Sequence, residues 1–427
     1  MHYVRLLRPA KIEGTAGDLA VSLLFTITTD LGDSFLCPED GSVDLIVAAV
    51  DSGAGPAGTA AAAALLRGRQ TTCRYKWKAG MRVLGAKVKL WPGLKREAVN
   101  CRVAIYPARQ HQQQPRREIS APLGILHIGD VLPWGAGTDN MPKTGVVVPA
   151  AFEFINGVCA PVSVRTLGLG TGYLRADSGD DDQLNLQFEE DIGESIARHI
   201  WDAGLVTSAY IADACSSSES IHQILPIEHE GFNVLELGSG VGILGIMIAS
   251  ILPRAAAAQG RVLKDARVLL TDLEEAEERA RSNIARAETA LALHSTDDAS
   301  VIIEYENLDW DEGRSGHFGP LAAATPWDLV VLSDCTYNVD SLPALVGTLS
   351  ALHAVKERRH DADDGSPVKS SVLLATKPRH SSEEALFGLL EDQGWAYRVV
   401  KEIPVPKIGD EDEVVQIYLL EKGSRVV

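Results

Sequence analysis

The spacing of apolar residues changes near residue 185. Before this point, apolar and β-branched residues form short alternating stretches that are typical of strands. Predicted strands lie at Val21–Thr29, Val43–Val50, Arg74–Lys78, Arg82–Leu90 and Val99–Tyr106. After it, short apolar runs alternate with segments whose apolar residues recur every three or four positions, as in amphipathic helices. We therefore expect a β-rich N-terminal module over residues 1–184 and a domain of alternating strands and helices over residues 185–427.

The second region predicts a doubly wound α/β sheet of seven strands. Strands are expected at Val234–Leu237, Arg267–Thr271, Val301–Tyr305, Leu329–Ser333 and Val372–Thr376, and helices at Glu190–Ala214, Ile243–Leu252, Leu273–Leu291, Leu342–Leu352 and Glu383–Gln393. Alternation of this kind gives a mostly parallel sheet. A final pair of strands, Tyr397–Ile403 and Val414–Glu421, has no helix between its members and predicts an antiparallel edge.

Four segments are expected to connect these elements. Gly53–Ala64 and Arg109–Arg117 have low complexity and are interpreted as surface insertions. Thr166–Asp182 is rich in glycine and aspartate and is interpreted as a linker. His360–Pro367 is expected to be an exposed loop.

Length, apolar runs and cysteine spacing limit the classes of protein to which the chain can belong. A chain of 427 residues is long enough for roughly two or three domains. It has no apolar run of the ~18 residues that a membrane span needs, and its N-terminus lacks the apolar core of a signal peptide. The six cysteines are scattered without a C-x-x-C pair. We therefore expect reduced thiols, a cytoplasmic or also nuclear location, and no metal site.

The net charge of −18 is unevenly distributed. Residues 1–150 carry 18 lysines and arginines against 12 acidic residues, whereas the rest of the chain carries 22 against 46. The acidic part either attracts basic protein segments and repels nucleic acid, or its charge serves only solubility. Within Arg74–Lys78, cations alternate with Tyr75 and Trp77, which predicts a basic face and an aromatic face. The basic face is either a solvated surface or a surface that docks an acidic partner.

A glycine motif directly follows the strand Val234–Leu237. Gly238, Gly240 and Gly242 alternate before an apolar helix, and Glu236 lies within the strand. Bare backbone at such a turn lets a nucleotide approach closely, and the helix N-terminus offers free N–H groups. The motif predicts a bound nucleoside cofactor. It also satisfies the dehydrogenase fingerprint through Gly240, Gly242 and Gly245, and a tight turn without a ligand is a third interpretation.

Four further side chains follow the other predicted strands. Asp272 can accept hydrogen bonds from ribose hydroxyls, or it can cap the next helix. Trp310 can stack on an adenine, or it can be a structural aromatic at a turn. Asp334 and Tyr337 form a D-x-x-Y motif after Leu329–Ser333, where a carboxylate can orient an amine and an aromatic face can stabilise a cation.

Taken together, these residues resemble the class I, seven-strand S-adenosylmethionine-dependent methyltransferases, and more closely the D-x-x-Y protein-lysine methyltransferases (methyltransferase family 16). The resemblance covers about residues 185–423. It rests on the segments Ile200–Gly204, Glu236–Gly242, Thr271–Asp272, Leu308–Trp310 and Asp334–Asn338, together with Asn283 and the final strand Val415–Leu420. The chain departs from the family pattern in an insert, Pro253–Ala266, and in its long N-terminal region.

The resemblance implies roles for individual residues and a substrate class. The residues expected to bind S-adenosylmethionine are Trp201, Glu236, Gly238, Gly240, Gly242, Asp272 and Trp310. Asp334 and Tyr337 would line the channel for the substrate lysine, and the substrate would be a non-histone protein. The target lysine, the number of methyl groups and the oligomeric state stay open.

Several alternatives remain. A methyltransferase of the same fold can act on histidine, a small amine or nucleic acid. Enzymes that methylate amino groups of nucleic acids usually carry prolines inside this motif, whereas Cys335 and Thr336 stand here. A nicotinamide dehydrogenase is disfavoured by Glu236 and by the antiparallel edge. A catalytically silent binding protein is disfavoured by the presence of Glu236, Asp272 and Asp334.

Overall fold

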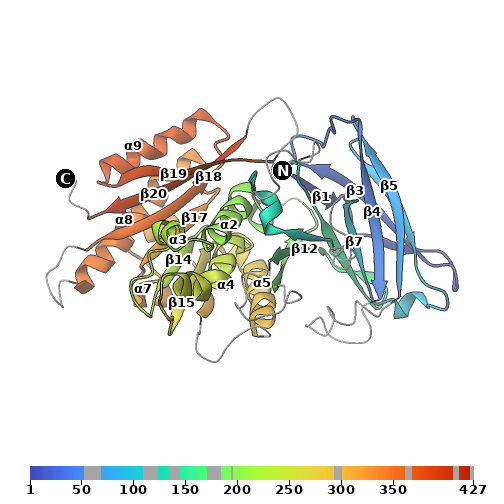
Figure 1. Cartoon of the computed structure of the whole chain (residues 1–427), viewed down its shortest axis with the longest axis horizontal. Helices are drawn as coiled ribbons and strands as arrows, with labels where there is room; N and C mark the ends of the chain where they lie inside the picture. The colour runs from blue at the N-terminus through green and yellow to red at the C-terminus, as the bar shows by residue number, and fades with distance from the viewer. Residues whose placement is uncertain are drawn as a thin grey trace. The chain divides into compact units, whose positions relative to one another are not determined.

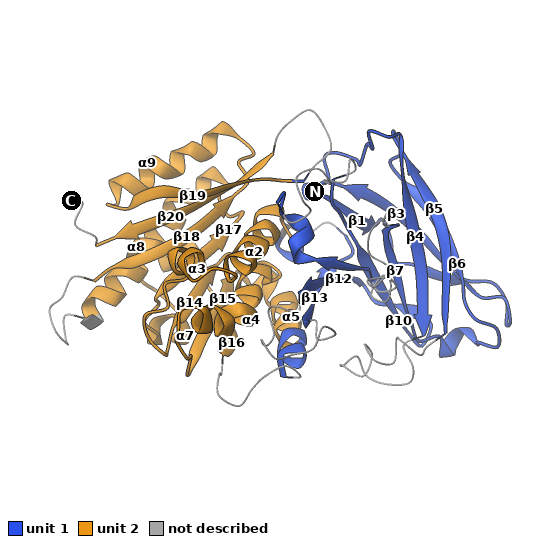
Figure 2. Cartoon of the chain, in the orientation of Figure 1, with its two compact units in different colours: residues 1–199, 286–294, 406–412 blue, residues 200–285, 295–405, 413–427 orange. Residues whose placement is uncertain are grey.

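The computed structural model describes residues 1–51, 69–108, 124–134, 145–170, 184–193, 196–292, 301–360, 368–406 and 413–423. The chain forms two compact units (Figure 2). Unit 1 contains Met1–His199, Arg286–His294 and Pro406–Asp412, and unit 2 contains Ile200–Ala285, Ser295–Val405 and Glu413–Val427. The sequence pattern places the change near residue 185. The units divide later because the strand that ends at Asp191 pairs within unit 1.

Unit 1 is built from two β-sheets. One sheet contains β1 (His2–Leu6), β2 (Lys11–Glu13), β3 (Ala20–Thr28), β6 (Leu84–Lys89) and β9 (Val147–Val148), in the order β2-β3-β1-β9 with β6 also paired to β3. The other contains β4 (Ser42–Asp51), β5 (Gln70–Lys78), β7 (Cys101–Pro107), β8 (Ile125–His127), β10 (Ala150–Ile155), β11 (Val158–Cys159), β12 (Val162–Leu169) and β13 (Leu184–Asp191). Its main order is β13-β12-β10-β7-β4-β5.

An apolar core joins the two sheets of unit 1. Phe25 from β3 stacks on Trp77 from β5 with ring centroids 6.5 Å apart, and Phe152 from β10 belongs to the same cluster. The indole N–H of Trp77 donates to the carbonyl of Leu36 over 2.8 Å, so this buried polar group is satisfied. The expected β-rich N-terminal module is confirmed.

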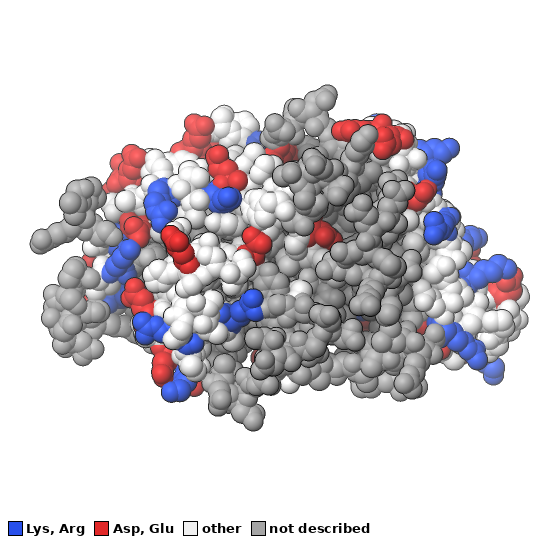
Figure 3. All heavy atoms as spheres, in the orientation of Figure 1, with Lys and Arg blue, Asp and Glu red and all other residues white. Residues whose placement is uncertain are grey.

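Strand β5 has the predicted basic and aromatic faces. Trp77 is buried and Tyr75 is half-buried, whereas Arg74, Lys76 and Lys78 are exposed. Lysine and arginine side chains are visible along the edge of unit 1 where β5 and β6 lie (Figure 3). Three described lysines of β5 and β6 have acidic partners. Lys76 lies 3.6 Å from Asp44, Lys87 lies 2.7 Å from Glu13 and Lys89 lies 3.0 Å from Asp18.

Unit 2 contains the predicted seven-stranded sheet (Figure 1). Its strands are β14 (Asn233–Leu237), β15 (Ala266–Asp272), β16 (Val301–Asn307), β17 (Leu329–Ser333), β18 (Ser370–Thr376), β19 (Ala396–Pro404) and β20 (Val414–Lys422). The order is β16-β15-β14-β17-β18-β20-β19. The first five strands are parallel, and β20 pairs antiparallel with β18 and β19. The strand order reverses at β14, which is where ligands bind in open α/β sheets.

Helices cover both faces of this sheet, which confirms the expected doubly wound fold. The helices are α2 (Asp202–Ala214), α3 (Ser218–Ile224), α4 (Ile243–Ala258), α5 (Glu274–Ala292), α6 (Trp310–Gly313), α7 (Pro320–Ala324), α8 (Leu342–His360) and α9 (Ala385–Asp392). Leu235 and Leu237 of β14 share one core with residues of α8 and α9. Glu236 points to the other face, where it contacts α4. Alternation along β14 therefore separates the two layers of helices. Within the described ranges, no helix is long and apolar enough to cross a membrane.

Two predictions in the region between residues 160 and 214 are wrong. The expected helix Glu190–Ala214 begins only at Asp202, because Glu190 and Asp191 are the end of β13. The expected linker Thr166–Asp182 begins as strand, because β12 pairs with β13 from Val162 to Leu169, and its residues 171–182 lie outside the described residues. In the insert Pro253–Ala266, α4 continues through Pro253 to Ala258. Gly53–Ala64, Arg109–Arg117 and residues 361–367 lie outside the described residues.

Candidate functional site

The turn after β14 has the left-handed backbone that its glycines permit. Gly238, Gly240 and Gly242 have φ values of 65°, 54° and 82°. A Cβ atom on Gly238 would lie 2.5 Å from the Cys335 sulfur and 3.2 Å from the Trp310 ring. A Cβ atom on Gly242 would collide with the Leu270 side chain. The turn therefore needs glycine both for its backbone angles and for close packing.

Glu236 supports this turn from within the sheet. Its side chain is buried, and Oε2 accepts a hydrogen bond from the Gly245 backbone N–H over 2.9 Å. Burial raises the pKa of Glu236 to about 8, and the charge of Asp272 acts in the same direction. On α5, Asn283 donates to the carbonyl of Val241 over 2.9 Å. The glycine turn is thus held from both sides by buried polar side chains.

Asp272 lies at the carboxyl end of β15, beside the same turn. Its Oδ2 accepts from the Gly240 backbone N–H over 2.7 Å, and its Oδ1 accepts from the Leu273 N–H over 2.7 Å. Because α5 begins at Glu274, neither donor is the second or third helical amide that an N-cap residue binds. Burial raises the pKa of Asp272, and these two N–H groups oppose that rise. Asp272 therefore orients the glycine turn.

Trp310 begins the short helix α6, just after β16. Asp309 caps this helix by accepting from the Asp311 N–H over 2.9 Å, and Thr348 donates to the Trp310 carbonyl over 3.1 Å. The half-buried indole lies against Gly238. The structure thus brings Trp310, Asp272 and the glycine turn together, as the sequence predicts for a nucleoside site.

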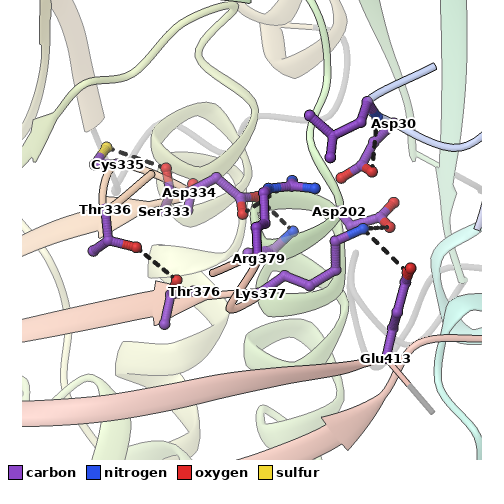
Figure 4. Close-up of polar contacts among 12 residues, drawn as sticks. Asp30, Asp202, Ser333, Asp334, Cys335, Thr336, Thr376, Lys377, Arg379 and Glu413 are labelled. Atoms are coloured by element: carbon purple, nitrogen blue, oxygen red, sulfur yellow. Dashed lines mark hydrogen bonds and ion pairs between the residues drawn. The ribbon is translucent and has the colours of Figure 1, made fainter. Parts of the chain in front are cut away.

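Asp334 follows β17 in a conformation that is unusual for a residue with a side chain. Its φ is 53°, in the left-handed region. Its Oδ2 accepts from the Ala203 backbone N–H over 2.7 Å, and its Oδ1 lies 3.6 Å from Nη2 of Arg379 (Figure 4). The Asp334 side chain is 5% exposed. In the same motif, Tyr337 is 55% exposed, and burial of part of its ring raises its pKa. A buried carboxylate and an accessible phenol are therefore separated by only two residues.

Trp201 immediately precedes α2. The Arg379 guanidinium lies over its ring, with Cζ 5.2 Å from the ring centroid. A cation at this distance from an indole face is attracted to it. Trp201 is thus beside Arg379, which in turn faces Asp334. Its predicted contact with the cofactor stays a prediction.

Sequence reasoning missed a group of charged residues next to Asp334. Lys377 is buried, and its Nζ donates to Oδ2 of Asp202 over 2.8 Å and to Oε2 of Glu413 over 3.2 Å (Figure 4). Asp202 is completely buried. The sequence signal for this group was the run of polar residues Lys377–His380, which directly follows β18. The carboxyl ends of parallel strands meet at one edge of the sheet, so these residues approach Asp334.

A second missed group fastens the D-x-x-Y loop to the segment after β18. Thr336 donates to Oε2 of Glu383 over 2.7 Å, and its hydroxyl lies 2.8 Å from that of Thr376. Oε1 of Glu383 accepts from the Arg379 backbone N–H over 2.8 Å. Glu383 therefore links the Thr336 side chain of the D-x-x-Y loop to the backbone of Arg379.

The glycine turn, Asp272 and Trp310 fit a nucleoside cofactor, and Asp334 lies next to them through Cys335. Gly238 has no space for a side chain between Trp310 and Cys335, and Cys335 adjoins Asp334 in the chain. The buried hydroxyl of Ser239 has no hydrogen-bond partner within the described residues, as expected where a polar ligand completes the site. One edge of the sheet thus presents a nucleotide cradle next to a buried carboxylate that can bind an amine.

Comparisons with known proteins agree with this geometry. A family model described as lysine methyltransferase matches residues 180–393. A UPF0665 family protein of Schizosaccharomyces pombe is 30% identical over 250 residues, which cover 58% of this chain and 60% of that protein. Protein-lysine N-methyltransferase EFM6 of Saccharomyces cerevisiae is 26% identical over 215 residues, covering 48% of this chain and 74% of EFM6. Protein N-lysine methyltransferase METTL21A of Mus musculus is 26% identical over 231 residues, covering 54% of this chain and 79% of METTL21A. The chain thus spans less than two thirds of the first of these relatives.

Proposed function

Because the chain belongs to the lysine methyltransferase family, we propose that it transfers a methyl group from S-adenosylmethionine to a lysine side chain of a non-histone protein. The observation that carries this proposal is the position of Asp334. Its carboxylate follows β17 and is next in the chain to Cys335, whose sulfur packs against the glycine turn of β14. A group that binds amines therefore adjoins the place where a nucleoside cofactor fits.

The cofactor is assigned to the cradle between the glycine turn, Asp272 and Trp310. Asp272 offers carboxylate oxygens for the ribose hydroxyls, which is a charge-assisted interaction. Trp310 offers an aromatic face for the adenine. Glu236 supports the turn through the Gly245 N–H. When bound, S-adenosylmethionine supplies an activated methyl group whose bond to sulfur breaks as the bond to nitrogen forms, leaving a neutral thioether.

Asp334 and Tyr337 are assigned to the acceptor lysine. The amine must present its lone pair to the methyl group, so the protein has to orient it and to favour loss of its proton. The Asp334 carboxylate can orient the nitrogen by hydrogen bonding. The exposed position of Tyr337 suits a residue that meets an incoming side chain. After transfer the nitrogen carries a positive charge, and the proton it releases passes to solvent.

The nature of the partner and the location of the protein are part of the proposal. A protein substrate agrees with the names of two relatives that methylate lysine in proteins. We expect no direct binding of nucleic acid, because residues 151–427 carry more than twice as many acidic as basic residues. All six cysteines are free, which agrees with a reducing compartment such as the cytoplasm or nucleus.

The test is incubation of the full-length protein with S-adenosylmethionine carrying a labelled methyl group and a cell extract. The labelled protein is isolated and the modified residue is identified by mass spectrometry. We expect the label on a lysine side chain. Label on histidine, on a small amine or on nucleic acid would replace the proposed substrate class with that alternative. No transfer and no binding of the cofactor would contradict the proposal.

A further inference from the structure

The Arg379 guanidinium lies at the acceptor side of the site. It is 3.6 Å from Oδ1 of Asp334 and stacks over the Trp201 ring. The Arg379 side chain is only 15% exposed, so this cation is screened weakly by solvent. The Asp334 carboxylate therefore carries its own counter-ion in addition to its hydrogen bond from Ala203.

We propose that Arg379 is a positioning residue that offsets the charge of Asp334, so that the acceptor site favours a neutral amine over an ammonium ion. The inference rests on the proposed function, because it concerns the lysine that Asp334 is assigned to bind. It adds a residue to the site and states what determines the charge of the acceptor.

The chemistry of methyl transfer requires that the negative charge of Asp334 be offset. A buried carboxylate without a counter-ion stabilises an ammonium ion next to it, since opposite charges within about 4–6 Å favour the charged form. An ammonium ion has no lone pair, so it cannot attack the methyl carbon. A fixed guanidinium beside the carboxylate opposes the ammonium and leaves hydrogen bonding to orient the neutral nitrogen. Arginine suits this role because it stays charged throughout the pH range of the protein.

The structure holds Arg379 in place by several contacts. Its backbone N–H donates to Glu383, which also accepts from Thr336 in the D-x-x-Y loop. Its side chain is supported by the indole of Trp201. The neighbouring cation, Lys377, donates to Asp202 and Glu413 instead. Of these two cations after β18, Arg379 is thus the one that faces Asp334.

Other charged groups face the site from the elements around it. Asp272 at the end of β15 and Glu236 on β14 both act with Asp334 to raise the pKa of the buried Cys335 thiol, after burial itself. Tyr337 lies on the same loop, and its pKa is raised by burial and by charges that include Asp272 and Glu275. The Lys377–Asp202–Glu413 group lies on the α2 side. Of these groups, the Asp272 carboxylate adds to the need for a cation beside Asp334, because a nearby negative charge favours a protonated acceptor.

The experiment uses two probes that need no knowledge of the substrate. S-adenosylhomocysteine lacks the transferred methyl group. Sinefungin carries an ammonium group at the corresponding position. Titration calorimetry at pH 7 with full-length protein gives the ratio of their affinities, which reports how strongly the acceptor site attracts a cation. A variant that disturbs the cofactor cradle as a whole changes the affinities for S-adenosylhomocysteine and sinefungin by the same factor, so their ratio stays unchanged.

The proposal predicts that Arg379→Gln increases the preference for sinefungin over S-adenosylhomocysteine by about fivefold, which corresponds to about 1 kcal/mol. Arg379→Lys keeps the charge and should change the ratio less than about twofold. Asp334→Asn with Arg379 intact should lower the ratio, because the carboxylate that attracts the ammonium is gone while the guanidinium remains. Arg398→Gln removes an exposed cation from β19 and should leave the ratio unchanged.

A second measurement uses methyl transfer to the labelled extract protein between pH 7 and pH 9. Arg379→Gln should slow transfer at pH 7 and recover part of the rate at pH 9, where the acceptor amine loses its proton more easily. If Arg379 had only a structural role, Arg379→Gln would lower the rate by the same factor at pH 7 and at pH 9. An unchanged or reduced sinefungin preference in Arg379→Gln would overturn the inference. Failure of the wild-type protein to bind either probe would instead contradict the proposed function.

Discussion

The backbone N–H of Ala203 donates a 2.7 Å hydrogen bond to the Asp334 carboxylate across 131 positions of the chain. Ala203 lies in the first turn of α2, where amide groups lack partners within the helix. Asp334 has the left-handed backbone that lets its side chain turn toward this helix. The Asp334 carboxylate is therefore oriented by a helix N-terminus as well as by Arg379.

The first prediction concerns the cofactor. S-adenosylmethionine and S-adenosylhomocysteine should raise the melting temperature, whereas NAD should not. A ligand at ~100 times its dissociation constant adds about 2.7 kcal/mol to the free energy of unfolding, which a thermal shift assay resolves. Asp272→Ala should weaken binding about tenfold or more, because hydrogen bonds to a charged group are worth about 1.5–3 kcal/mol. The matched control is Asp392→Ala on the exposed side of α9. Stabilisation by NAD alone would indicate a dehydrogenase.

The second prediction separates the acceptor site from the cofactor site. Asp334→Ala and Tyr337→Ala should abolish methyl transfer while the affinity for S-adenosylhomocysteine changes less than about threefold, which is below 1 kcal/mol. Both side chains are assigned to the amine and neither to the nucleotide. Asp340→Ala, an exposed acidic residue after the same motif, serves as control. Normal turnover in both variants would remove Asp334 and Tyr337 from the lysine channel.

The third prediction concerns the pH dependence of stability in the ligand-free protein. The pKa of Glu236 is about 8 in the folded state because of burial, against an ordinary value of 4.5. The folded state therefore holds this proton more tightly than the unfolded state. Its contribution to stability is complete below pH 4.5 and is lost as the pH rises through 8, by at most about 1.4 kcal/mol per pH unit.

Glu236→Gln should remove this loss, because an amide keeps an acceptor for the Gly245 N–H without titrating. Urea unfolding of both proteins from pH 5 to pH 9 measures the difference. The variant should gain stability relative to wild type as the pH rises. If the free energies of unfolding of the wild type and the variant changed in parallel from pH 5 to pH 9, Glu236 would not take up a proton in the folded state.

The fourth prediction concerns a buried ion pair in unit 1. Arg165 binds Glu190, and both side chains are almost fully buried. Burial alone would raise the pKa of Glu190, but Arg165 and His199 outweigh it and hold this pKa well below its usual range. Glu190→Ala should therefore lower the free energy of unfolding by about 3–5 kcal/mol at pH 7, because Arg165 stays charged and buried.

Equilibrium unfolding in urea tests this value. Asp44→Ala, which breaks the exposed pair with Lys76, should cost less than about 1 kcal/mol. The Glu190 contribution should also fade as the pH falls below the carboxyl's ordinary value, because the unfolded state then takes up the proton first. Equal costs for the two variants would show that the buried pair is not a stabilising contact.

The fifth prediction tests the basic surface of β5 and β6. The triple variant Lys76→Glu/Lys78→Glu/Lys87→Glu should keep most of the stability, since these residues are exposed. If the surface docks an acidic region of the substrate, the variant should methylate the intact substrate more slowly, most strongly at low salt. It should methylate a short lysine peptide from that substrate at the normal rate.

A matched control reverses three exposed lysines outside these strands, Lys95, Lys264 and Lys369. It carries the same change in net charge, so a rate loss shared by both triple variants would reflect overall charge. Equal rates of the first variant on intact substrate and on peptide would leave the basic surface as a solvated face.

The sequence predicts the sheet of unit 2 well because its signals are local. The strand Val234–Leu237 and its glycine turn occupy consecutive positions, and Leu329–Ser333 agrees with β17 residue for residue. The lysine methyltransferase family and the doubly wound fold are both confirmed. In contrast, Glu190 and Asp191 look like the polar start of a helix, but pairing with β12 makes them strand. Only a partner elsewhere in the chain decides that.

The candidate site was predictable where its residues adjoin predicted strands of the same sheet. Asp272 and Trp310 follow predicted strands and could be placed at one edge of the sheet. Lys377 and Arg379 also follow a strand, but their partners are Asp202 and Asp334, which are distant in sequence. The neighbouring sequence does not distinguish such cations from solvated surface charges. Their partners can be identified only in the assembled sheet.

The buried pair of Asp202 and Lys377 has a consequence for synthesis of the protein. These two residues are 175 positions apart, and a ribosome adds about 5–20 residues per second. For roughly 9–35 seconds, α2 has emerged without the cation that later neutralises its first residue. During this time a helix of mostly apolar residues cannot settle in its final place without burying an unpaired carboxylate. We therefore expect the acceptor side of unit 2 to be completed last on the ribosome, which makes nascent α2 a target for chaperones.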